Sequence, residues 1–335
     1  YGGSSGYGDA TLNTVEISDT AFTGGIVVGG QSVESGDATQ NSVEITNSSG
    51  SLDSIYGGWS KLGNVAGNEI HVEGGTVGAV AVAGGYSESG TAADNEVTIT
   101  SGGTFRDVYG GRAGNGSAAG NTVTLAGGTY TGAVMGGAGI IGDDSEGNII
   151  IDVTDNSVEV AGSTVKNVFG SYTESGAASG DVTIINGQFS GGVIAGAYSV
   201  TGGSANTNTV EITNGALATG GTATSVYGGF AGTGTASGNT VEITGNTFSG
   251  GTIAGGSGGS GASNNTVSIT SGGTFMNVFG GYAENGAATV NTLNLTTGTY
   301  RGIIAGGVSE AGTATENTVN IFENAIFNGG VLLYG

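Results

Sequence analysis

Residues 265–290 read NTVSITSGGTFMNVFGGYAENGAATV, and related blocks return about every 26 to 28 residues along this chain of 335 residues. Each block opens with a corner like Asn265-Thr266-Val267 and continues with an apolar, polar, apolar triplet. A repeat period between about 20 and 50 residues indicates a solenoid, a propeller or a related array. The corners begin at Asn13, Asn41, Asn68, Asn95, Asn121, Asn148, Gly180, Asn208, Asn239, Asn265, Asn291 and Asn317.

The triplets predict short β-strands. In Val43-Glu44-Ile45 the two branched residues fall on one face of a strand and the acid on the other, and branched side chains suit a half-buried sheet. Two further apolar positions follow, such as Phe105 and Val108, and Gly and Asn fill the gaps between them. These residues break helices and favour turns, so each repeat is expected to form two or three strands joined by tight bends.

The length of the repeat decides between the all-β arrays. A propeller blade needs about 40 residues or more, whereas about 27 residues suit one coil of a parallel β-helix. The sequence therefore predicts an all-β parallel β-helix, or β-solenoid, of about 12 coils. Residues 1–335 are expected to form a single repeat array, with irregular insertions near 138–157 and 217–225.

The residue before each Gly-Gly pair alternates in size from one repeat to the next, as in Tyr56, Ala83 and Tyr109. This alternation predicts a superperiod of two repeats, about 53 residues. Two arrangements fit it. If one coil holds one repeat, each aromatic residue lies over a small one, and if one coil holds two repeats, aromatic residues stack on each other. The first arrangement is favoured.

The charge balance limits the partners. The chain carries 27 acidic residues and five Lys and Arg, for a net charge of −22. Phosphate recognition needs clustered Lys and Arg, so no nucleic-acid partner is expected, and anionic membrane surfaces are disfavoured. We find no transmembrane run and expect no direct membrane insertion of this segment. High acidity and few sites for trypsin-like proteases suit an extracellular location at a bacterial cell surface.

Three groups of residues are candidates for a structural or binding role. An asparagine amide both donates and accepts hydrogen bonds, so stacked corner asparagines are expected to form a structural ladder. Five aromatic residues could form an exposed row that stacks on sugars, and three acidic residues in the first insertion could hold Ca²⁺, which prefers oxygen ligands. The ladder comprises Asn13, Asn41, Asn68, Asn95, Asn121, Asn208, Asn239, Asn265, Asn291 and Asn317; the row comprises Tyr56, Tyr109, Phe169, Tyr227 and Phe279; the calcium candidates are Asp143, Asp144 and Glu146.

The repeat pattern Asn-Thr-Val-x-Ile-x-Gly-Gly-Thr-Phe, followed by Val-Tyr-Gly-Gly and Ser-Gly-Ala-Ala, resembles the passenger repeats of Gram-negative autotransporters and of haemagglutinin-like surface proteins. The resemblance covers practically the whole chain. It implies a β-helical stalk displayed outside the cell, often for adhesion or biofilm formation.

These observations favour a non-enzymatic extracellular structural or adhesive rod, without catalytic residues or a cofactor other than possible Ca²⁺. The chain begins at Tyr1 and ends at Tyr334-Gly335 in equivalent parts of the repeat, so we expect a piece of a longer protein that self-associates end to end or side to side. A glycan or a host or bacterial surface is the expected partner.

Two other functions stay open. The first is a carbohydrate-binding module that uses the aromatic row. The second is a β-helical polysaccharide lyase or hydrolase, which would need a basic residue in a groove or two carboxylates about 5 to 10 Å apart. Arg106, Arg112 and Arg301 lie in different repeats, and this scatter disfavours an enzyme.

Overall fold

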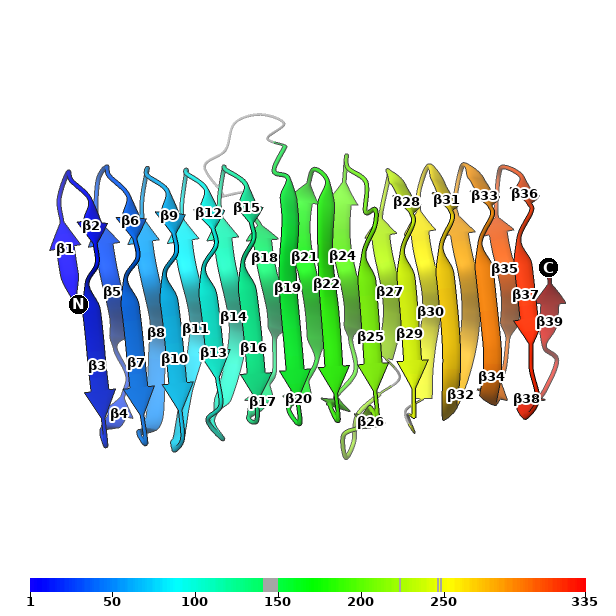
Figure 1. The fold of residues 1–335 in the computed structure, drawn as a ribbon, viewed down its shortest axis with the longest axis horizontal. Coiled ribbons are helices and arrows are strands. Elements are labelled where there is room, and N and C mark those ends of the chain that lie inside the picture. The colour runs from blue at the N-terminus through cyan, green and yellow to red at the C-terminus, as the bar shows by residue number, and fades with distance from the viewer. Residues whose placement is uncertain (141–149, 223, 246, 248) are drawn as a thin grey trace. The chain divides into compact units, whose positions relative to one another are not determined.

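The computed structural model describes residues 1–140, 150–222, 224–245, 247 and 249–335. These residues form parallel β-strands joined by turns and bends, without a helix among them. The strands make about 12 turns of a β-solenoid, which confirms the expected fold class. The chain divides into two compact units, Tyr1–Val165 with Gly170–Glu174, and Lys166–Phe169 with Ser175–Gly335. Figure 1 shows the strands of each unit lying side by side.

The triplet after each corner forms one strand of the coil, here called the corner strand. Val15 pairs with Val43, Val43 with Ile70, and Ile70 with Val97, always in parallel register. Like residues therefore lie over like residues, one repeat per coil. The corner strands are β3 (Thr14–Ser18), β7 (Ser42–Thr46), β10 (Glu69–Glu73), β13 (Glu96–Ile99), β16 (Thr122–Ala126) and β19 (Val153–Ala161) in the first unit, and β22 (Ala178–Ile185), β25 (Thr209–Thr213), β29 (Thr240–Thr244), β34 (Thr292–Tyr300) and β37 (Thr318–Ile321) in the second.

The X-Gly-Gly-Y segment of each repeat lies in a second strand, here called the Gly-Gly strand. Its register is equally strict: Ala83 pairs with both Tyr56 and Tyr109, and Gly85 with both Gly58 and Gly111. The Gly-Gly strands are β1 (Gly3–Ser5), β5 (Ile26–Ser32), β8 (Ser49–Ser60), β11 (Thr76–Ser87), β14 (Thr104–Ala113) and β18 (Ala133–Gly139), then β21 (Asn167–Ser175), and β24 (Val193–Thr201), β27 (Thr224–Ala231), β30 (Ser249–Gly258), β35 (Ile303–Ser309) and β39 (Leu332–Tyr334) in the second unit; the long strand β32 (Thr266–Ala283) joins a corner strand to a Gly-Gly strand.

Many coils also contain short strands near their two ends. Before the Gly-Gly strand lie β4 (Ala21–Thr23), β17 (Thr129–Tyr130), β20 (Thr164–Val165), β23 (Gln188–Phe189), β26 (Ala216–Leu217) and β38 (Ala325–Phe327). Before the corner lie β2 (Ala10–Thr11), β6 (Ala38–Thr39), β9 (Val65–Ala66), β12 (Ala92–Ala93), β15 (Ala118–Ala119), β28 (Thr235–Ser237), β31 (Gly261–Ser263), β33 (Ala287–Thr289) and β36 (Ala314–Thr315).

The core is a set of apolar columns inside the coils. Val43 and Ile45 of a corner strand are fully buried, and so are Phe105 and Val108 from the second and third apolar positions. The large rings stack from coil to coil: the centroids of Phe105 and Tyr130 lie 5.5 Å apart at an interplanar angle of 15°. The apolar periodicity of the repeat thus corresponds to the interior of the solenoid.

The alternation in size of the residue before each Gly-Gly pair does not change the number of repeats per coil, which is one. Because each repeat forms one turn, aromatic and small residues alternate along a column, and the structure does not confirm a superperiod of two repeats. Corner asparagines lie 26 to 28 residues apart in regular coils. The separation rises to 35 residues between Asn121 and Asn156 and to 31 between Asn208 and Asn239. These longer coils contain the segments 138–157 and 217–225.

Candidate functional site

The corner asparagines are hydrogen-bonded in a column inside the first unit. Asn41 Nδ2 donates to Asn68 Oδ1 at 2.9 Å, and the backbone N–H of Asn41 donates to the same oxygen at 3.0 Å. Asn41 Nδ2 also donates to the backbone carbonyl of Ala10. Each interior amide is therefore bound to the coils on both sides. The column runs through Asn13, Asn41, Asn68, Asn95, Asn121 and Asn156.

The second unit has an equivalent column. At the corner that lacks an asparagine, Gly180 donates its backbone N–H to Asn208 Oδ1 at 2.8 Å. The amide-to-amide hydrogen bonds then run through Asn208, Asn239, Asn265, Asn291 and Asn317.

One expected corner is wrong. The corner that follows Asn121 is Asn156, whose Oδ1 accepts from Asn121 Nδ2 at 2.8 Å, and not Asn148. Asn148 itself lies outside the described residues. The sequence offers two matches to the corner pattern here, NIII from Asn148 and NSVEV from Asn156, and the strand that continues the column is the one after Asn156.

The left-handed backbone at these corners belongs to the residue before the asparagine. Gln40 has φ of 54°, Asp94 of 53° and Val290 of 57°, while Gly67 and Gly120 take the position in other coils. The side chain at this position varies in size from one coil to the next, whereas the left-handed backbone conformation is kept. The asparagine thus contributes its amide to the column, and the left-handed conformation is supplied by its neighbour.

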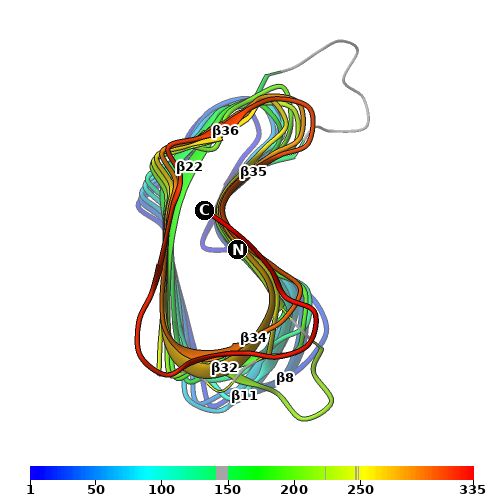
Figure 2. The same cartoon turned by 90° about the vertical axis from the view of Figure 1, so that its right-hand side faces the viewer.

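The Gly-Gly pair brings the opposite wall of the coil against this column. A Cβ added to Gly58 would lie 2.5 Å from Asn68 Nδ2, and one added to Gly85 would lie 2.6 Å from the side chain of Asn95. At these two positions a residue without a side chain fits at that distance. In the second unit Ala197, in register with Gly229, occupies the equivalent position. Figure 2 shows the result: the wall that contains β35 curves inward toward the wall that contains β22.

The outer side of the Gly-Gly strands, here called the Gly-Gly face, carries the five residues of the expected aromatic row. In the first unit Tyr56 and Tyr109 are half-buried and are separated by Ala83. In the second unit Tyr227 is half-buried, whereas Phe169 and Phe279 are each only 7% exposed. The row is therefore discontinuous, with an aromatic ring in every second coil of this column.

A second column on the same face was missed by the sequence analysis. The residue just after each Gly-Gly pair also points outward, and it is often aromatic, as in Trp59, Tyr86, Phe230 and Tyr282. Its signal was present in the sequence three residues beyond the first column. Aligning the repeats at the glycines would have revealed it.

The two columns pack together in the first unit. The rings of Tyr56 and Tyr86 have centroids 5.9 Å apart. The guanidinium carbon of Arg112 lies 4.8 Å from the Tyr86 centroid and 5.7 Å from the Tyr109 centroid, in cation–π geometry. Burial raises the pKa of the Tyr86 hydroxyl, and Arg112 opposes that rise. Arg112 thus has a packing role on this face.

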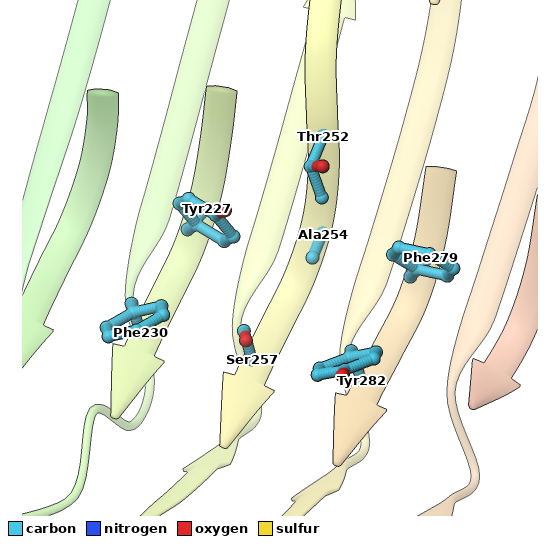
Figure 3. A pocket seen from close by; sticks show the side chains of 7 residues that line it. All are labelled: Tyr227, Phe230, Thr252, Ala254, Ser257, Phe279 and Tyr282. Carbon is cyan, nitrogen blue, oxygen red and sulfur yellow. The ribbon is translucent and has the colours of Figure 1, made fainter. Parts of the chain in front are cut away.

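In the second unit the columns leave a cavity of about 340 Å³. Aromatic pairs flank it on two strands, and a coil with small side chains forms its floor between them. Figure 3 shows the side chains projecting from three neighbouring strands. They are Tyr227 and Phe230 on β27, Thr252, Ala254 and Ser257 on β30, and Phe279 and Tyr282 on β32.

One rim residue of this cavity is held from outside. The Tyr282 hydroxyl donates a hydrogen bond to Glu310 Oε1. That bond, together with burial and the negative charge of Glu310, raises the pKa of Tyr282 to about 12. The phenol is therefore neutral and fixed in place at ordinary pH.

The remaining sequence candidates lie elsewhere. The calcium candidates Asp143, Asp144 and Glu146 fall outside the described residues. Within the described part of the chain there is no group of three or more His, Cys, Asp or Glu that could hold a metal ion. His71 lies in an outward column, paired in register with Glu44, and its Nε2 is 3.3 Å from Glu73 Oε2. No helix long and apolar enough to cross a membrane occurs in that part either.

No protein-family model, curated protein or solved structure matches this chain.

Proposed function

We propose that this chain is a non-enzymatic extracellular structural and adhesive repeat protein, and that the Gly-Gly face makes its adhesive contacts. The observation that carries the proposal is the pair of outward columns rich in half-buried aromatic side chains on that face. Clustered exposed apolar side chains mark interaction surfaces on soluble proteins. Aromatic rings supply large contact areas with little loss of conformational entropy.

The coil structure supports the structural part of the role. Repeats that contact mainly their neighbours gain stability from stacking, and here each regular coil contributes an asparagine amide to a continuous hydrogen-bonded column. A scaffold of this kind fixes outward side chains at a spacing of about 4.8 Å along the stack. Repeated weak contacts on such a surface add up to strong attachment through multivalency.

The charge and packing of the basic residues and of the cavity favour a binding role over enzymatic catalysis. Arg106 is paired with Asp107 at 2.8 Å, and Arg112 packs on two tyrosine rings, so both have structural partners. The cavity on the Gly-Gly face is lined by aromatic, hydroxyl and small side chains. These groups suit recognition of an uncharged surface.

The proposal is tested by coating microspheres with the folded chain and measuring their retention under flow on bacterial cells, animal cells and polysaccharide films. We expect saturable retention that is lost on unfolding and is weakened by Trp59→Ala and Phe230→Ala. Tyr7→Ala is the matched control, because Tyr7 is 82% exposed but lies outside the two columns. Retention that is insensitive to both column variants, or release of cleaved sugar from the films, would contradict the proposal.

A carbohydrate-binding module is the second candidate. The cavity between Tyr227 and Phe279, two members of the expected aromatic row, favours it. Self-association and a calcium site in the first insertion stay predictions.

A further inference from the structure

The cavity on the Gly-Gly face exists because of one coil. Ala254 in the first column and Ser257 in the second are both small, and each neighbouring coil carries an aromatic residue in both columns. An earlier coil of the same unit is different. Its first column also has alanine, Ala195, but its second has Tyr198, whose ring stacks on Phe230 with centroids 4.3 Å apart. Tyr198 therefore fills the position that Ser257 leaves open.

The space suits one puckered ring. Aromatic residues two coils apart are separated by about 9.6 Å along the stack, twice the strand spacing. Contact between carbon atoms needs about 3.5 to 4.0 Å on each side of an inserted group. One ring fits between the flanking side chains, and a saturated, non-planar ring fills the gap better than a flat one. The volume of about 340 Å³ is at the lower end of small-molecule sites, roughly 300 to 1,000 Å³.

The lining combines two chemistries. Tyr227, Phe230, Phe279 and Tyr282 offer aromatic faces with negative electrostatic character, which attract C–H groups. Thr252 and Ser257 carry hydroxyl groups on the floor, which can donate and accept hydrogen bonds. The rim hydroxyl of Tyr282 already donates to Glu310, so toward a ligand it can only accept. A ligand with an apolar ring face and a hydroxylated edge satisfies both. A purely aromatic ligand would offer no hydrogen-bond partner to the floor hydroxyls of Thr252 and Ser257.

Charge selects among such ligands. The chain has a net charge of −22, and Glu310 is hydrogen-bonded to the rim residue Tyr282. Like charges repel, so a uronate or another acidic sugar would be disfavoured. None of the side chains that line the cavity is charged.

We propose that this slot binds one pyranose unit of a neutral glycan. The inference rests on the proposed adhesive role of the Gly-Gly face and names the chemical class that the face recognises.

Isothermal titration with short neutral oligosaccharides of glucose, galactose and mannose tests the slot. We expect saturable binding of at least one of them at one site per chain, and much weaker binding of oligogalacturonate. Ser257→Tyr reproduces the Ala195–Tyr198 arrangement and should lower affinity at least about tenfold. Ser257→Ala, the control, keeps the space open and removes one hydroxyl, so it should retain most of the affinity.

A variant that is expected to gain a second site completes the test, because added binding cannot result from misfolding of the variant. Tyr198→Ser removes the ring that stacks on Phe230 and should open a second slot between Phe169 and Tyr227, with about twice the binding stoichiometry. The proposal is overturned if no neutral oligosaccharide binds, if folded Ser257→Tyr binds as well as the parent chain, or if Tyr198→Ser adds no site.

The two proposals fail in different ways. Microspheres that adhere although no oligosaccharide binds would remove the sugar slot and leave the adhesive role intact. Oligosaccharide binding in a chain whose microspheres do not adhere would remove the adhesive role and leave the slot.

Discussion

Two buried tyrosines inside the coils differ in the hydrogen bonding of their hydroxyl groups. Tyr130 and Tyr300 both have fully buried side chains, and each stacks on a phenylalanine of the preceding coil. Their hydroxyl groups differ. Tyr300 donates to the backbone carbonyl of Thr297 at 2.6 Å, whereas the Tyr130 hydroxyl has no hydrogen-bond partner among the described residues. Burial raises the pKa of both phenols, so both are neutral.

Replacing these tyrosines with phenylalanine should have opposite effects. A buried polar group without a partner costs about 1 to 3 kcal/mol, so Tyr130→Phe should raise the free energy of unfolding by about 1 kcal/mol. Tyr300→Phe removes a satisfied hydrogen bond and should lower it by about 1 kcal/mol. Urea unfolding followed by circular dichroism measures both. Equal effects of the two variants would contradict this account of the interior.

The hydrogen bond from Tyr282 to Glu310 gives a testable pH dependence. The pKa of Tyr282 is about 12 in the folded chain and 10.0 for an ordinary tyrosine. Because the neutral phenol is favoured in the folded chain, Tyr282 contributes to the free energy of unfolding in full below pH 10. This contribution is lost as the pH rises from 10 to 12. The phenolate absorbance difference between the parent chain and Tyr282→Phe should have its midpoint near pH 12.

Glu310→Gln provides the control for this titration. It keeps a hydrogen-bond acceptor but removes the charge, so the midpoint should move back toward 10. A parent midpoint already at 10 would show that the rim of the cavity is not held by Glu310.

At the scale of the element, the Gly-Gly strand and the asparagine column depend on each other. The glycine allows close approach, and the asparagine amide occupies the space that a side chain would need. The inward curve of the wall, which forms the Gly-Gly face, follows from this contact. A change at the glycine should therefore disturb both the column and the face.

Gly85→Ala tests that dependence. Its Cβ would lie 2.6 Å from the side chain of Asn95, which is buried and bonded on both sides. Overpacking of this kind typically costs about 1 to 3 kcal/mol, and we expect the upper part of that range in urea unfolding. Gly102→Ala is the matched control, because its nearest neighbouring atom is 3.6 Å away and its φ is not positive, so it should be neutral or slightly stabilising. Equal costs at the two glycines would refute the close-contact explanation.

The elements were largely predictable, and the site only in part. The local alternation of branched and polar residues, as in Val43-Glu44-Ile45, predicts a strand with one buried face. Val43 and Ile45 are indeed fully buried in the structure. The cavity depends on which residues meet across coils, for example Ser257 beside Phe230. That information becomes available only once the register is fixed. The ambiguity between Asn148 and Asn156 had the same origin, because an insertion shifts the repeat without changing its local pattern.

At the scale of the whole molecule, the account rests on one repeat per coil with like positions in register within each unit. The columns of asparagine, of apolar residues and of aromatic residues all follow from it. The competing arrangement, with two repeats per coil, would place Glu69 beside Thr122 instead of Glu96. The two arrangements thus differ in which exposed residues are neighbours.

Engineered disulfides distinguish these arrangements most directly, because the chain contains no cysteine. Glu69 pairs in register with Glu96, and Glu96 with Thr122. Neighbouring strands are about 4.8 Å apart, within the Cα separation of about 4.4 to 6.8 Å that a disulfide allows, whereas two coils span about 9.6 Å. Mild oxidation followed by thiol counting should show a bond in Glu69→Cys/Glu96→Cys and free thiols in Glu69→Cys/Thr122→Cys. The reverse result would contradict the stacking of one repeat per coil, and with it the Gly-Gly face and its sugar slot.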